Sequence, residues 1–102
     1  MSKIQLSKEI EINGEKVNEI EYDLESLTGK NVQDSLKELQ KTGYVPTVQE
    51  LDGVFHSYLF AAASGLDPSD ISRLSMKDYI KATGVVRDFF VKDTVDSQQV
   101  AI

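Results

Sequence analysis

The sequence predicts an α+β fold, in which an N-terminal antiparallel β-hairpin is followed by a small bundle of three to four helices. Apolar and polar residues alternate over residues 3–23 around Asn13-Gly14, the strongest short signal for a hairpin turn because both residues tolerate positive φ. Apolar residues then recur at helical spacing over residues 29–91. Capping residues and glycines divide this second region into separate helices.

The hairpin is expected to have one apolar face and one solvated face. Lys, Glu and Gln alternate with the apolar positions, and the glutamates read as a solvated face rather than as paired carboxylates for acid–base chemistry. A lone hairpin is marginal in water, so it must pack on the helices or pair with another chain. The apolar positions are Ile4, Leu6, Ile10, Ile12, Val17, Ile20 and Tyr22.

Helices are expected at about residues 29–41, 47–64, 68–74 and 76–91. Thr28 is placed to cap the first helix, and Thr47 with Glu50 forms a capping-box pattern at the start of the second. The second helix is the most apolar segment and is predicted to be the central core helix. Asp67-Pro68 is typical of the start of the third helix.

The length of the chain allows one domain with one modest core. We expect this domain to cover residues 1–91, with a flexible C-terminal tail over residues 92–102, where helical periodicity stops. No apolar run approaches the roughly 20 residues that span a bilayer, and the N-terminus lacks the apolar core of a signal peptide.

The charge of the chain argues against two classes of partner. Seventeen acidic and eleven basic residues give a net charge of −6, which disfavours nucleic acid and anionic membrane surfaces. A basic protein partner fits this charge better. Cysteine is absent, so neither disulfides nor thiolate ligands are available, which fits a cytosolic protein.

No catalytic, cofactor or metal site is expected. His56 is the only histidine and is interpreted as a helix residue at the edge of the packed face, since zinc sites and catalytic triads need more partners. Asp67, Asp70 and Asp78 do not match a calcium-loop spacing. Helix capping and the helix dipole account for all three carboxylates.

The aromatic residues of the helices are the candidate partner-binding residues. Most of such a stripe belongs to a core, but Phe60 falls off the main stripe of its helix, and the adjacent Phe89 and Phe90 cannot both face the same way. A small domain with surplus large apolar side chains often uses them to contact a partner. The candidates are Phe55, Tyr58, Phe60, Tyr79, Phe89 and Phe90.

Several stretches occur in an order that has a parallel among known families. Residues 6–10 read Leu-Ser-Lys-Glu-Ile, residues 24–29 read Leu-Glu-Ser-Leu-Thr-Gly, and residues 63–66 read Ala-Ser-Gly-Leu. Asp78-Tyr79 and Phe89-Phe90 follow in the last helix. Together they resemble the tail assembly chaperones of tailed bacteriophages, the family that includes the small E-type proteins, over most of residues 4–91.

This sequence departs from the family pattern at three places. Glu9 stands in place of a proline, Glu25-Ser26 stands in place of Arg-Glu, and residues 42–46 form a longer insert.

The resemblance implies a non-catalytic protein without a cofactor. Such proteins are similar in binding the tape measure protein, the long helical ruler of the tail, and in helping to recruit the tail tube protein. The resemblance also implies a homo-oligomer in the cytoplasm of the bacterial host that is absent from the mature virion. A groove between the helices of residues 47–64 and 76–91 would suit an apolar helix, and many weak sites along one polymer would act by avidity.

Other functions are compatible with the residues. A structural tail component would be present in purified virions, whereas a chaperone would not. A single-partner phage adaptor would bind one folded partner at fixed stoichiometry. A small enzyme would reveal itself by thermal stabilisation with a substrate or metal.

Overall fold

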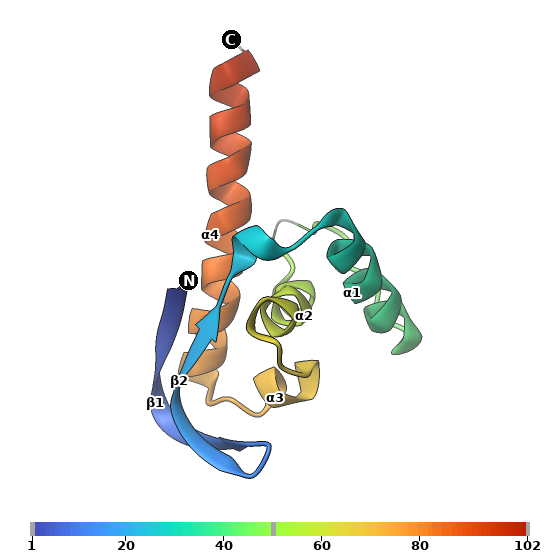
Figure 1. Ribbon diagram of the computed structural model, residues 1–102. Helices are drawn as coiled ribbons and strands as arrows, with labels where there is room; N and C mark the ends of the chain where they lie inside the picture. Colours follow the sequence, from blue (N-terminus) through green and yellow to red (C-terminus); the bar gives the residue numbers. More distant parts are fainter. Residues whose placement is uncertain (1, 50, 102) are drawn as a thin grey trace.

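The computed structural model describes residues 2–49 and 51–101, with side chains described up to residue 92 (Figure 1). A two-stranded antiparallel hairpin precedes a short 3-10 turn and four helices, so the predicted α+β fold is confirmed. The elements are β1 (Ser2–Ile12), β2 (Glu15–Tyr22), η1 (Leu24–Ser26), α1 (Gly29–Lys41), α2 (Gly53–Ser64), α3 (Pro68–Ser72) and α4 (Met76–Ala101).

Helix α2 is the centre of the molecule, as its apolar sequence predicted. It contacts α1, α3, α4 and β2, while β1 packs on α4 (Figure 1). Burial of apolar side chains from all these layers is the main stabilising term. The buried apolar residues are Ile4, Ile12, Ile20, Leu39, Phe55, Leu59, Phe60, Ala61, Ile71, Leu74, Ala82 and Val86.

The hairpin turns at the predicted position, with φ of 53° at Asn13 and 83° at Gly14. Its ladder is interrupted in β1, because Gln5 pairs with Glu19 whereas Ile10 pairs with Val17. Between these pairs β1 advances five residues and β2 advances two. Residues 6–9 therefore form a bulge, and bulges re-aim the backbone groups and side chains they contain. We call this segment the β1 bulge.

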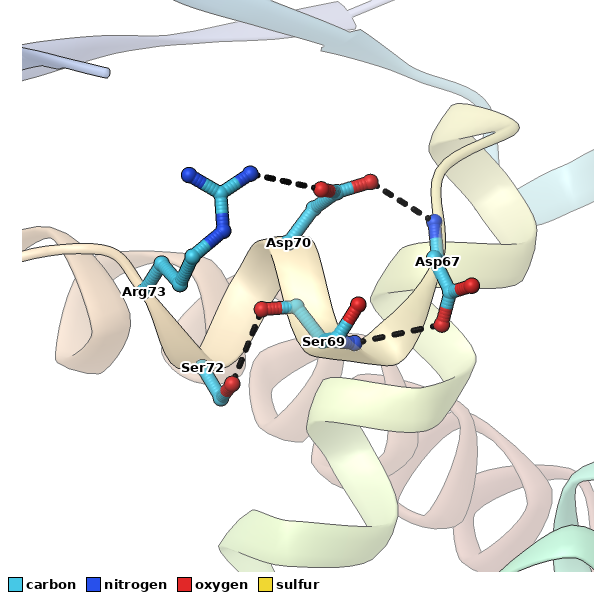
Figure 2. A network of polar contacts seen from close by, with 5 residues as sticks. All are labelled: Asp67, Ser69, Asp70, Ser72 and Arg73. Atoms are coloured by element: carbon cyan, nitrogen blue, oxygen red, sulfur yellow. Dashed lines mark hydrogen bonds and ion pairs between the residues drawn. The ribbon is translucent and has the colours of Figure 1, made fainter. Parts of the chain in front are cut away.

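Two helix starts follow the capping predicted from the sequence. The Asn31 N–H donates to Thr28 Oγ1 over 3.4 Å at the start of α1. At α3 the Ser69 N–H donates to Asp67 Oδ1 over 3.3 Å, and the Asp67 N–H donates to Asp70 Oδ2 over 3.2 Å (Figure 2). Reciprocal pairs of this kind satisfy backbone donors that the helix itself leaves free.

The predicted start of the central helix was wrong. Helix α2 begins at Gly53 rather than at residue 47, and its cap is Asp52, whose Oδ1 accepts from the Phe55 N–H over 2.9 Å. The preceding residues form a turn instead, in which the Leu51 N–H donates to the Val48 carbonyl over 3.1 Å. Glu50, part of the predicted capping box, lies outside the described residues.

The last helix is longer than predicted. Residues 92–102 were expected to form a flexible tail, but α4 continues to Ala101, and residue 102 is outside the description. Glycine and proline are absent between residues 85 and 101, so the sequence contains no residue that would end the helix there. The upper part of α4 extends beyond the hairpin and the other helices (Figure 1).

Two glycines should respond in opposite directions to alanine. Gly65 ends α2 with φ of 73°, where a Cβ is disfavoured, so we expect Gly65→Ala to lower the free energy of unfolding by about 1 kcal/mol. Gly84 lies inside α4 with open space around an added Cβ, so Gly84→Ala should raise it by about 0.5–1 kcal/mol. Urea unfolding of both variants tests this pair, and changes of the same sign would contradict it.

Candidate partner-binding site

The structure separates the six candidate aromatic residues into three pairs. Phe55 and Phe60 are each 0% exposed and belong to the core. The Phe60 ring centroid lies 5.1 Å from that of Tyr22 on β2. The expectation that Phe60 lies off the packed face was wrong. Helix α2 is packed by α1, β2 and α4, so it has buried residues on several of its faces.

Tyr58 and Tyr79 form the second pair. They line an open depression of about 640 Å³ between α2, α3 and α4, together with Val54 and Leu66. Both tyrosines are half-buried, so each presents part of its ring to this depression.

Phe89 and Phe90 form the third pair and line a smaller pocket of about 260 Å³. Its opposite wall comes from residues 24, 25 and 27–29, the stretch that leads from β2 into α1 and passes beside α4 (Figure 1). Val32, Leu59 and Val86 complete the apolar lining. We call this cavity the Leu27 pocket.

The expected groove between the second and last helices is replaced by direct packing. The ring centroids of Phe55 and Phe90 lie 6.5 Å apart across this contact. The depression at Tyr58 and Tyr79 and the Leu27 pocket share no lining residue, so they are two separate cavities. The folding of the chain thus brings Leu24–Gly29 next to Phe89-Phe90, two segments whose proximity was not evident from the sequence.

A further depression of about 360 Å³ adjoins the Leu27 pocket and shares Leu24, Glu25 and Phe89 with it. Its charged lining residues are Asp23, Glu25, Asp88 and Lys92, three carboxylates against one ammonium group. We call it the acidic depression.

Asp78 is a buried carboxylate whose role was missed in the sequence. It is 0% exposed, and its two oxygens accept the Ser7 N–H over 2.9 and 3.0 Å and the Lys8 N–H over 3.3 Å. Nearby, Lys81 Nζ donates to the Gln5 carbonyl over 2.6 Å. The β1 bulge frees the Ser7 and Lys8 N–H groups from the ladder, and α4 holds the hairpin through them and through the Gln5 carbonyl.

The environment of Asp78 keeps its carboxylate ionised. Burial acts to raise the pKa of Asp78, but hydrogen bonds from the Ser7 backbone, the Ser7 side chain and the Lys8 backbone together lower it below the usual value. The explanation of Asp78 as a helix cap was wrong, because Ser75 Oγ accepts the Asp78 N–H over 3.3 Å and takes that place. Among the sequence motifs shared with the family, only the Asp78-Tyr79 pair includes this residue.

The remaining polar candidates have structural partners. His56 is 1% exposed, its Nε2–H donates to the Gln49 carbonyl over 2.8 Å, and its ring stacks on Phe90 at 5.3 Å. Asp70 pairs with Arg73 over 2.7 Å (Figure 2). Among the described residues, no group of three or more histidine, aspartate or glutamate side chains is arranged to hold a metal ion.

The model of a known protein family matches residues 3–91, and that family is described as phage tail assembly chaperone proteins, E, or 41 or 14. This chain belongs to that family. The match includes both walls of the Leu27 pocket and both sides of the Asp78 contact. No curated protein and no solved structure matches the chain.

Membership supports a chaperone role in tail assembly and implies interaction with phage tail proteins. A chaperone family also indicates a non-catalytic protein. In the part of the chain that the structure describes, no helix combines the length and apolar character needed to cross a bilayer.

Proposed function

We propose that this tail assembly chaperone binds the tape measure protein and assists assembly of the tail tube. The observation that carries the proposal is the Leu27 pocket, an apolar cavity at the surface built from Leu24–Gly29 and the Phe89-Phe90 pair. A tape measure chain presents apolar helical seams before tube subunits enclose it. An apolar pocket on an acidic body can cover such seams and keep the complex in solution.

Exposed apolar side chains elsewhere support a binding role. Val45, Leu51 and Met76 are between 63% and 79% exposed. Exposed side chains of this size are compatible with further contacts to a partner or to other copies. We propose that the protein acts as a homo-oligomer in the host cytoplasm, binds the tape measure at many weak sites, and leaves before the virion is complete.

Co-expression with a tape measure protein tests the proposal. The chaperone should raise the soluble fraction of that protein and co-purify with it in several copies. A partner that stays insoluble while the chaperone elutes alone would overturn the proposal. Recovery of the chaperone from purified virions would identify a structural tail component instead, and a fixed one-to-one complex would identify an adaptor.

A matched pair of variants on α4 tests the site. Phe89→Ser removes part of the Leu27 pocket, so it should reduce co-purification by about tenfold, the effect of losing a typical apolar anchor. Ile80→Ser removes an exposed apolar side chain of the same helix outside that pocket and should have little effect. Equal recovery with both variants would place the contact elsewhere.

A further inference from the structure

We propose that the partner segment is an amphipathic helix that inserts one large apolar side chain into the Leu27 pocket and places a lysine or arginine in the acidic depression. This inference rests on the proposed function and adds the chemistry of the partner. It is carried by the adjacency of the two cavities, which have Leu24, Glu25 and Phe89 in common.

The Leu27 pocket suits an apolar group. Its volume of about 260 Å³ is below the roughly 300–1,000 Å³ of pockets for small-molecule ligands, but it has room for one large side chain. Thr28, a polar residue of its wall, already hydrogen bonds with Asn31, since its N–H donates to Asn31 Oδ1 over 2.7 Å. A polar ligand group would therefore lose its water without gaining an equivalent partner at this residue.

The acidic depression suits a cation. Asp23, Glu25 and Asp88 outweigh Lys92, and Glu25 and Asp88 are exposed. Among the described residues, the ion pairs join other residues than these three carboxylates. The same surplus disfavours a second copy of this chain, whose net charge is −6, as the occupant.

The arrangement along α4 favours a helical partner. Val85, Asp88, Phe89 and Lys92 line the acidic depression at the spacing of one helix face. The Leu27 pocket lies beside them, with Val86, Phe89 and Phe90. A helix placed next to α4 would present its own residues at three- and four-residue spacing, so an apolar anchor and a basic residue one turn apart reach both cavities.

Two synthetic amphipathic helices of equal length test this chemistry. Both carry the same leucine seam, but one has lysine and the other glutamate one turn from each leucine. Fluorescence anisotropy of labelled peptides should give about tenfold tighter binding for the lysine helix, and this advantage should shrink at high salt. Equal affinities, or an advantage for the glutamate helix, would overturn the inference.

A charge-reversal pair gives the matched control. The double variant Glu25→Lys and Asp88→Lys should weaken binding of the lysine helix by about tenfold. Glu9→Lys with Glu11→Lys makes the same change in net charge on exposed positions of β1 and should leave it unchanged. Circular dichroism of both variants checks that they fold. An equal loss of affinity in both double variants would show a general effect of net charge, and the proposed role of Glu25 and Asp88 would be wrong.

The inference and the proposed function fail in different ways. If the tape measure protein co-purifies equally with the wild type and with the Glu25/Asp88 variant, the inference is wrong and the proposed function stands. If the lysine helix is preferred but the tape measure protein never co-purifies, the pocket chemistry stands and the proposed function fails.

Discussion

Replacing Phe60 by alanine is expected to lower the free energy of unfolding by about 3–5 kcal/mol, the usual cost of removing a fully buried phenylalanine ring. Phe60 is 0% exposed, and its ring lies 5.1 Å from that of Tyr22, so the cavity would open between α2 and the hairpin. Domains of this size are stable by about 5–15 kcal/mol in total, so the variant should be close to the unfolding threshold.

Urea unfolding followed by circular dichroism measures this effect. Phe89→Ala is the comparison, because Phe89 is half-buried and should cost less than half as much. If Phe60→Ala instead kept wild-type stability and lost only partner binding, the ring would be a contact residue, as the sequence first suggested.

Replacing Asp78 by alanine is expected to cost about 2–4 kcal/mol, because the partly buried hydrogen bonds from the Ser7 and Lys8 N–H groups lose their charged acceptor. Asp78→Asn retains one acceptor oxygen and should fall between the wild type and the alanine variant. Asp34→Asn alters an exposed carboxylate with a 3.7 Å ion pair to Lys30 and should change stability by less than about 0.5 kcal/mol. Equal stability of the Asp78→Ala and Asp34→Asn variants would show that the contact contributes little.

The pH dependence of stability provides an independent test of Asp78. Its folded-state pKa is lowered from the ordinary value of 3.8, so the stability it contributes is present above that value and is lost as pH falls through the folded pKa. Urea unfolding from neutral to strongly acidic pH should show a smaller acid loss in Asp78→Asn than in the wild type. Parallel profiles would mean that the carboxylate is not held in its ionised form.

The elements with local signals were predictable from the sequence. The Asn13-Gly14 turn, the Thr28 cap and the Asp67-Pro68 start each depend on a few neighbouring residues, and the structure contains all three. The start of α2 was harder, since Thr47 and Asp52 both carry cap signals and Gly53 reads as a helix breaker. In the structure the cap is Asp52, whose Oδ1 accepts the Phe55 N–H.

The site itself depended on contacts between distant segments. Phe60 could not be placed from helical periodicity, because α2 is apolar on several faces and more than one of them is buried. Nothing near Asp78 in the sequence indicates that the β1 bulge will present two free N–H groups to it. The Leu27 pocket likewise requires Leu24–Gly29 and Phe89-Phe90 to meet. The sequence indicated that Phe89 and Phe90 exceed what the core needs, but it did not indicate that Leu24–Gly29 forms the opposite wall of their pocket.

The contact between Ser7 and Asp78 joins residues that are 71 positions apart. Closing so long a loop is entropically costly, and contacts of this kind slow folding. On the ribosome the hairpin emerges first, while the carboxylate that holds it is still to be translated. Helix α2 can cover β2 earlier, but the part of the hairpin that packs on α4 stays uncovered until the beginning of α4 is made. During this period the newly synthesised chaperone is itself prone to aggregate.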